Sequence, residues 1–114
     1  MNAEKLLDKE YRDAWVDESV KTVLPFQIRA IRAKRRWSQA KLGKMAGMKP
    51  HSVSRLESDH RHSPNISTLL RLAHAFDCAL LVKFVPFSKM AEEFADVSDE
   101  SLAVIDFDAE RPRD

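Results

Sequence analysis

The sequence predicts a mainly α-helical fold with one short β-strand near its C-terminus. Only two glycines interrupt the 114 residues, and the five prolines fall at expected element boundaries, so long helices are permitted. Apolar residues recur at helical spacing over most of the chain. From residue 79 to residue 87 the pattern changes to Ala-Leu-Leu-Val-Lys-Phe-Val-Pro-Phe, a β-favouring run closed by a proline.

The composition indicates one compact domain with a single modest core. Apolar residues make up 44% of the chain and charged residues 32%, which is typical of a globular protein and unlike a disordered one. No apolar run approaches the roughly 20 residues that span a bilayer, and the N-terminus lacks the layout of a signal peptide. We therefore expect a cytoplasmic protein with no membrane partner.

Metal binding and catalysis are disfavoured by the types of residue present and their placement. Cys78 is the one cysteine, so neither an internal disulfide nor a paired-thiol metal site is expected. Cys78 and His74 could resemble a thiol and its base, but no orienting third group or oxyanion donors accompany them. His51 lies on a predicted helix, whereas His60 and His62 lie in a loop without zinc-type spacing. We therefore expect no enzyme activity, no metal and no cofactor.

Two helices are predicted before residue 37. Residues 4–21 form an amphipathic helix, and Pro25 suits the first turn of the next one, because its missing N–H costs nothing there. The second helix is expected to end near residue 36. The apolar side chains expected on the inner faces are Leu7, Tyr11, Ala14, Trp15 and Val20 in the first helix and Phe26, Ile28 and Ile31 in the second.

Two short helices joined by a tight turn are predicted next. Ser38 can cap a helix over residues 39–45, because its hydroxyl can accept a bond from a free N–H of the first turn. Gly47 ends this helix, since glycine adopts the left-handed conformation cheaply. Pro50 suits the first turn of the following helix, over residues 51–58. The predicted inward side chains are Ala40, Leu42, Ala46, Val53 and Leu56, with Met48 filling the space between the helices.

A further helix and the predicted strand follow a polar loop. Asn65 or Ser67 can cap the helix, and its predicted inward residues are Leu69, Leu70, Leu72, Ala73 and Phe76. The strand has no second strong strand in the chain to pair with, and an unpaired apolar edge promotes aggregation. We therefore expect it to pair with the same strand of a second copy through Leu80, Leu81, Val82 and Phe84.

The C-terminal part is expected to be the least ordered. Ser88 can cap a last short helix that ends near residue 94, and the acidic chain beyond Asp96 is expected to be mobile. A small apolar group, Val104, Ile105 and Phe107, interrupts this tail. The chain then divides into a leading amphipathic helix at 1–24, a helix-turn-helix domain at 25–78, a dimerisation strand with a short helix at 79–95, and an acidic flexible tail at 96–114.

The formal net charge of +1 hides an uneven distribution along the chain. Residues 29–62 carry ten basic and two acidic residues, whereas residues 89–114 carry three basic and nine acidic ones. A basic block can bind a polyanion by releasing the counterions condensed on it, which is the main sequence-independent source of affinity for DNA. The charge pattern therefore favours a nucleic-acid partner for the central segment.

The two short helices indicate how double-stranded DNA would be bound. The second helix would stand out from the surface, narrow enough to enter the major groove. Arg55 can donate two hydrogen bonds to guanine, and His51 can donate to or accept from a purine edge, whereas Ser52 and Ser54 are short and suit phosphates or thymine. The residues expected to contact phosphates are Lys41, Lys44, Lys49, Arg61 and His62.

Three stretches of the central segment carry a family resemblance: Trp37-Ser-Gln, Val-Ser-Arg-Leu-Glu57 and Pro-Asn-Ile-Ser-Thr-Leu-Leu-Arg-Leu-Ala. With them, the segment resembles the phage-repressor and Cro-type (Xre-like) helix-turn-helix regulators. The resemblance covers residues 26–78 and implies a lambda-repressor-like bundle. It implies that Gln39 contacts the DNA backbone and that Arg32 and Glu57 tie the first family helix to the recognition helix. The base-reading positions that it implies are Pro50, His51, Ser54 and Arg55.

Two departures from the family pattern stand out. Pro50 removes a side-chain hydrogen bonder from a reading position, and the leading helix lies outside the basic family domain. The principal expectation is a homodimeric repressor of its own or a neighbouring promoter, bound to a palindromic operator with half-sites ~34 Å apart. The alternative is an antitoxin that binds a toxin protein through its terminal segments and autoregulates through the helix-turn-helix.

Overall fold

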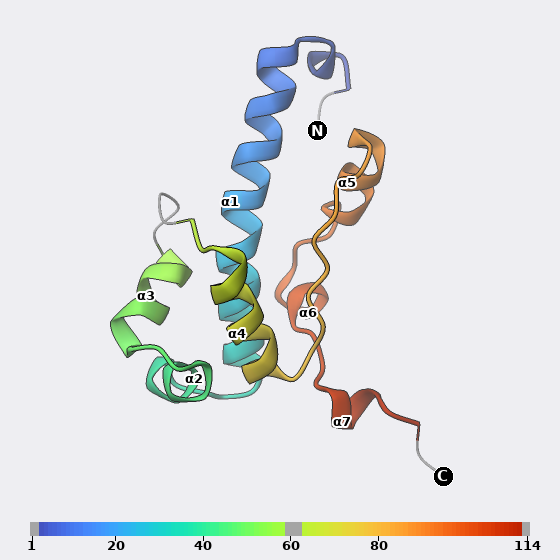
Figure 1. The fold of residues 1–114 in the computed structure, drawn as a ribbon. Helices are drawn as coiled ribbons and strands as arrows, with labels where there is room; N and C mark the ends of the chain where they lie inside the picture. Colours follow the sequence, from blue (N-terminus) through green and yellow to red (C-terminus); the bar gives the residue numbers. More distant parts are fainter. Residues whose placement is uncertain (1–2, 59–62, 113–114) are drawn as a thin grey trace.

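A computed structural model describes residues 3–58 and 63–112, and in this part of the chain it contains helices joined by irregular segments (Figure 1). The helices are η1 (Lys5–Leu7), α1 (Lys9–Lys34), α2 (Gln39–Ala46), α3 (Pro50–Ser58), α4 (Ile66–Phe76), α5 (Phe87–Glu93), α6 (Asp99–Leu102) and α7 (Phe107–Glu110). None of the described helices is both long and apolar enough to cross a membrane.

The first long helix, α1, runs without interruption through Pro25, so the predicted break between two helices is wrong. A proline inside a helix cannot donate the backbone bond to the preceding turn and usually kinks or ends it. Here Pro25 is buried, Leu24 packs against the core and Ile28 belongs to it. Packing of these neighbours against the bundle offsets the lost bond, and a local sequence pattern does not reveal such packing.

The hydrophobic core lies where α2, α3 and α4 pack around the C-terminal half of α1 (Figure 1). Leu42 from α2 and Val53 from α3 are completely enclosed, as expected for the two helices that contact each other most extensively. The remaining buried members of the core are Ile28, Ile31, Ala46, Leu56, Leu72, Ala75 and Phe76. The predicted core of the helix-turn-helix is therefore largely confirmed.

Some apolar residues predicted to face inward are exposed instead. Ala40 and Leu70 lie on the outer surfaces of α2 and α4. Leu7 and Val20 are exposed as well, because the N-terminal half of α1 extends beyond the bundle and meets only short elements there (Figure 1). Helical spacing predicts one apolar side of a helix, but it does not show how far along the helix a partner extends.

The predicted dimerisation strand is wrong: no strand is present in the described residues, and residues 78–86 form an irregular connection between α4 and α5. A β-strand requires ladder hydrogen bonds from a neighbouring strand, and no described segment supplies them. Leu80 is half-buried, whereas Leu81, Val82 and Phe84 are exposed. β-favouring side chains thus describe the composition of this segment but do not produce a sheet without a partner.

The short helix that follows, α5, starts two residues earlier than predicted. Pro86 is the N-cap of α5 and makes no side-chain capping bond, so the predicted Ser88 cap is wrong. The ring of Pro86 fixes its φ at −63°, which is compatible with the residue before a helix, so α5 begins there without a side-chain cap.

The acidic C-terminal segment contains α6 and α7 and contacts the bundle. Leu102 is buried, and α6 packs against α1. The Gln27 side-chain amide donates to the Leu102 carbonyl at 3.3 Å, and the Phe107 backbone N–H donates to the Asp77 carbonyl at 2.9 Å. Val104 lines a small apolar cavity between α1 and α4. The segment predicted as a mobile tail therefore has specific docking contacts.

Arg35 joins the C-terminal segment to the end of the bundle. Its guanidinium donates to the Phe76 carbonyl at 2.6 Å and to the Val104 carbonyl at 3.1 Å. It also lies over the rings of Trp37 and Phe76, with 5.3 and 5.5 Å to their centroids. One side chain at the end of α1 thus links α4 and the segment after α6.

Candidate nucleic-acid interface

Local hydrogen bonds set the ends of α2 and the start of α3. The Ser38 hydroxyl accepts a bond from the Lys41 backbone N–H at 3.0 Å, which confirms the predicted N-cap. Gly47 ends α2 with a φ of 71° in the left-handed region, as predicted from its lack of a Cβ. Pro50 is the first residue of α3. The turn between the two helices is therefore encoded at three positions close together in the sequence.

Gly43 allows the chain to pass close to α2 after the turn. The Met48 backbone N–H donates to the Gly43 carbonyl at 2.8 Å, and a Cβ added at Gly43 would lie 2.5 Å from the Met48 carbonyl oxygen. Our sequence reasoning missed this role. A glycine in the middle of an eight-residue helix was the available signal, because helix interiors disfavour glycine unless a close approach requires it.

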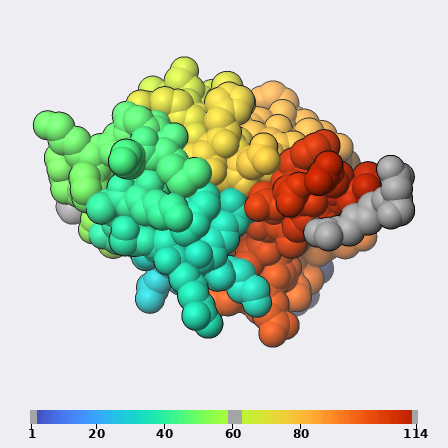
Figure 2. Space-filling view, turned by 90° about the horizontal axis from the view of Figure 1, so that it is seen from below, coloured from blue at the N-terminus to red at the C-terminus, as the bar shows by residue number. Residues whose placement is uncertain are grey.

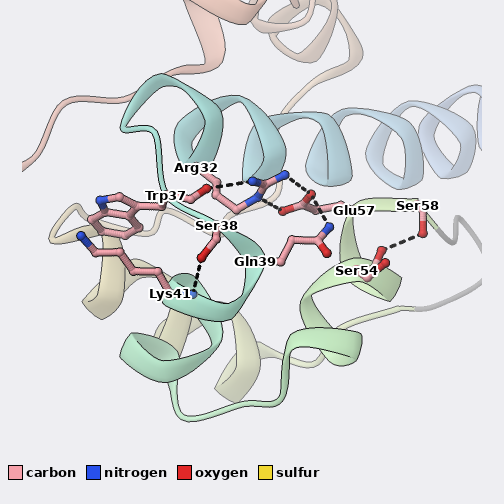
Figure 3. Close-up of polar contacts among 8 residues, drawn as sticks. All are labelled: Arg32, Trp37, Ser38, Gln39, Lys41, Ser54, Glu57 and Ser58. Carbon is pink, nitrogen blue, oxygen red and sulfur yellow. Dashed lines mark hydrogen bonds and ion pairs between the residues drawn. The ribbon is translucent and has the colours of Figure 1, made fainter.

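A bidentate ion pair anchors α3 to α1 (Figure 3). Arg32 Nε donates to Glu57 Oε2 at 2.7 Å, and Arg32 Nη2 donates to Glu57 Oε1 at 2.9 Å. Only 17% of the Arg32 side chain and 5% of the Glu57 side chain are exposed. The hydrogen bond to Glu57 raises the pKa of Arg32, which keeps the guanidinium charged.

The same cluster ties α2 to this ion pair. The remaining guanidinium nitrogen of Arg32, Nη1, donates to the Trp37 carbonyl at 2.9 Å, and the Gln39 side-chain amide donates to Glu57 Oε1 at 3.3 Å (Figure 3). α1, the start of α2 and the end of α3 therefore meet at one set of charge-assisted bonds. This fixes the orientation of α3 on the bundle.

The outward face of α3 carries most of the candidate base-reading side chains. Pro50, His51 and Arg55 are exposed, and Ser54 is half-buried. Val53 and Leu56 lie on the opposite side of the helix and are buried against the core. The Ser54 carbonyl accepts the Ser58 hydroxyl at 2.7 Å (Figure 3). The exposed side of α3 thus offers one guanidinium and one imidazole to a ligand.

The candidate phosphate-contacting side chains are spread along α2, the turn and the first residues of α3. Lys41, Lys44 and Lys49 are exposed and Ser52 is half-buried. Lys41 lies over the Trp37 ring, with its Nζ 5.3 Å from the ring centroid (Figure 3). Arg61 and His62 lie outside the described residues, as does His60. Seen from below, α2 and α3 occupy one side of the molecule and the acidic α7 the other (Figure 2).

Arg71 from α4 supports the turn, a role that the sequence did not suggest. Its Nη1 donates to the Gly47 carbonyl at 3.1 Å. A bond between residues 24 positions apart has no local sequence signal. The conformation of the turn therefore depends on α4 as well as on Gly47.

Cys78 is a half-buried thiol next to the bundle and away from α3. It packs against the core beside a small apolar cavity between α1 and α4. Burial raises the pKa of the Cys78 thiol, so the thiol stays protonated near neutral pH.

Comparison with known protein families supports the geometry of α2 and α3. Residues 28–82 match the sequence profile of a family described as helix-turn-helix. Comparisons with curated proteins and with solved structures gave no significant match. The matched segment contains the Arg32–Glu57 ion pair, the Gly47 turn and the whole of α3, together with the resemblance in the Trp37 to Glu57 segment. The match therefore assigns residues 28–82 to the helix-turn-helix family and supports the resemblance to Xre/Cro-like DNA-binding regulators.

Proposed function

We propose that this protein is a homodimeric repressor that binds a palindromic operator with α3 in the major groove. The observation that carries the proposal is the exposure of His51 and Arg55 on a helix whose opposite face is buried and whose end is fixed by the Arg32–Glu57 pair. A rigidly held helix with cationic and hydrogen-bonding groups at its exposed positions can place them against base edges.

Each side chain of α3 has a distinct proposed role. Arg55 donates two parallel hydrogen bonds to O6 and N7 of guanine, and His51 contacts a purine edge. Ser54 is close enough to the helix backbone to make only short contacts. Pro50 offers no hydrogen bond and contributes an apolar contact, which suits a thymine methyl group.

The proposed backbone contacts position α3 without reading sequence. Charged side chains on α2 and the turn meet phosphates on either side of the groove, and Gln39 at the start of α2 adds a neutral contact. The residues proposed for this role are Gln39, Lys41, Lys44, Lys49, Ser52, Arg61 and His62.

Dimerisation is proposed because one chain presents a single recognition helix. Two copies related by a two-fold axis place their α3 helices about one helical turn of DNA apart, ~34 Å, on adjacent half-sites. A dimer on such a site would exclude polymerase from an overlapping promoter, either its own or a neighbouring one. The copies would associate without the β-strand pairing excluded above.

Selection of binding sites from random double-stranded DNA tests this proposal. The expected result is a palindromic consensus with guanine at a fixed position in each half-site, bound by two chains per duplex in sedimentation experiments. A matched selection with Arg55→Ala is expected to lose the preference at that guanine. Recovery of unrelated sequences by the unaltered protein would contradict the proposal.

A second candidate function is that of an antitoxin, which would bind a toxin protein as well as DNA. The parts of the chain outside the family match support it, because the N-terminal half of α1 and α5 lie at the end of the molecule away from α3 (Figure 1). A partner bound there would leave the recognition helix free. The expected result is that the protein co-purifies with the product of an adjacent small reading frame. A variant that lacks residues 1–23 is expected to lose that complex.

A further inference from the structure

A groove separates the N-terminal half of α1 from α5 and the chain that follows it. Its volume is about 550 Å³, which lies in the range of sites that hold several side chains or a small molecule. Most of its lining side chains are apolar, and two hydroxyl groups and one carboxylate complete it. The lining residues are Trp15, Glu18, Ser19, Thr22 and Val23 from α1 with Ala91, Phe94, Ala95 and Val97 from the α5 side.

The groove is formed by side chains that hold α5 against α1. The rings of Trp15 and Phe87 lie 6.2 Å apart between centroids. Trp15, Val23 and Phe94 are only half-buried, so apolar surface remains accessible inside the groove. Since half-buried aromatic residues beside accessible apolar surface are enriched at protein interfaces, this lining favours a protein segment as the occupant.

Charge indicates which kind of segment fits. Glu18 is the one charged residue among those that line the groove. The elements on its two sides, residues 9–23 and 87–97, together carry seven acidic and four basic residues. Two of these bases are held by neighbouring carboxylates: Lys9 lies 2.7 Å from Asp13, and Lys89 lies 3.4 Å from Glu93.

This charge excess argues against the two other obvious occupants. A nucleic acid would be repelled by the acidic surroundings of the groove. In a symmetric dimer formed through this surface, the two grooves would bring two sets of like charges together. A basic partner with an apolar face meets neither objection.

We propose that this groove binds a short amphipathic segment of another protein, with apolar residues in the groove and a lysine or arginine paired with Glu18. An amphipathic helix that lays its apolar face into a groove is a common mode of recognition, and the cation opposite Glu18 sets its orientation. The inference deepens the antitoxin candidate and rests on it for its biological setting, but it is independent of DNA binding by α3.

A synthetic peptide of leucine and lysine with helical periodicity serves as the probe, and a peptide in which glutamate replaces lysine serves as its control. Backbone and indole NMR signals of the full-length protein are followed during titration. The leucine–lysine peptide is expected to shift the signals of Trp15, Ala91 and Phe94 in a saturable way, and the leucine–glutamate peptide is expected to leave them unchanged. Equal shifts with both peptides, or shifts confined to the acidic C-terminal segment, would overturn the proposal.

Two charge reversals one residue apart on α1 sharpen the test. Glu18→Lys replaces an attraction by a repulsion, so the affinity for the leucine–lysine peptide is expected to fall about fivefold or more. The same variant is expected to bind the leucine–glutamate peptide. Asp17→Lys makes the same charge change beside the groove, outside its lining, and is expected to lower the affinity for the leucine–lysine peptide by less than about twofold. Equal weakening by both variants would mean that overall charge governs binding and would refute the role of Glu18.

The remaining outcomes separate this inference from the proposals for DNA binding and for self-association. Groove signals that shift with protein concentration, without peptide, would identify a second copy as the occupant and overturn the proposal. The operator selected by Glu18→Lys is expected to match that of the unaltered protein, because α3 lies at the other end of the molecule (Figure 1). If the unaltered protein keeps its operator preference but does not bind the leucine–lysine peptide, the groove proposal is refuted and the DNA-binding proposal is not.

Discussion

The helix-turn-helix of α2 and α3 and the C-terminal segment of residues 79–112 are stabilised in different ways. In α2 and α3, a capping serine, a left-handed glycine and a proline at the helix start act within a few residues of one another, and Leu42 and Val53 are fully enclosed. The C-terminal segment buries one leucine and depends on bonds from Gln27 and Arg35 to carbonyls 75 and 69 residues away, respectively. The first region is therefore specified locally, and the second is specified by its docking surface.

The largest expected difference between the two regions is in the effect of a leucine truncation. Leu42→Ala is expected to lower the free energy of unfolding by about 2–5 kcal/mol, because it leaves a cavity in a closed core. Leu81→Ala, at a position that is 77% exposed, is expected to change it by less than about 0.5 kcal/mol. Urea unfolding followed by circular dichroism measures both. Equal losses would show that residues 79–86 are packed as tightly as α2.

The next largest difference is expected in how much one ion pair contributes to stability in each region. Glu57→Ala removes a nearly buried carboxylate and leaves the Arg32 guanidinium without its main partner, at an expected cost of about 3 kcal/mol. Glu93→Ala breaks a solvent-exposed contact with Lys89, so the expected cost is below about 0.5 kcal/mol. Both are read from the midpoints of thermal or urea unfolding. A Glu57 variant as stable as the Glu93 variant would remove the ion pair from the account of how α3 is anchored.

Arg35 tests whether the C-terminal segment can open on its own. Arg35→Ala removes two charged hydrogen bonds in a partly exposed setting, with an expected local cost of about 1–2 kcal/mol. Hydrogen exchange of the Phe107 amide, which bonds the Asp77 carbonyl, is expected to become roughly tenfold faster. The Val53 amide in α3 is expected to be unaffected. Lys34→Ala, at an exposed neighbour, is the control, and faster exchange throughout α3 would contradict separate stabilisation of the two regions.

The smallest expected effect concerns the Cys78 thiol, which lines the small apolar cavity together with Val104 of the C-terminal segment. Burial raises its pKa, so less thiolate is present in the folded protein at a given pH, and thiolate is the reactive form. Reaction with a thiol reagent near pH 8 is expected to be slower in the folded protein than in urea. A folded rate equal to the rate in urea would show that Cys78 is not shielded.

The helix-turn-helix was predictable because its signals are local. Ser38 and Asn65 cap their helices as their side-chain chemistry requires, and Gly47 ends α2 in the conformation that glycine favours. The pairing of Arg32 with Glu57 was predicted from the resemblance to a family, and the structure places the two side chains in contact. Whether the exposed side chains of α3 contact bases stays a prediction.

The parts that could not be predicted depend on contacts between distant residues. Continuation of α1 through Pro25 depends on core packing, and the docking of Leu102 depends on a surface of α1 far away in the sequence. The strand expected at residues 79–87 was inferred from composition, which does not supply the ladder bonds that a strand needs. Gly43 carried a signal that could have been read, since a mid-helix glycine often marks a close approach of the backbone.

The most direct test of the central claim, that α3 reads DNA sequence, is the affinity of Arg55→Ala for the selected operator and for all its single-base variants. Fluorescence anisotropy at one fixed salt concentration provides these affinities. The account predicts a loss of about 1–3 kcal/mol on the operator and equal affinities for all four bases at one position of each half-site. Uniform weakening on every sequence, with base preference retained at all positions, would contradict it and would make Arg55 a phosphate contact only.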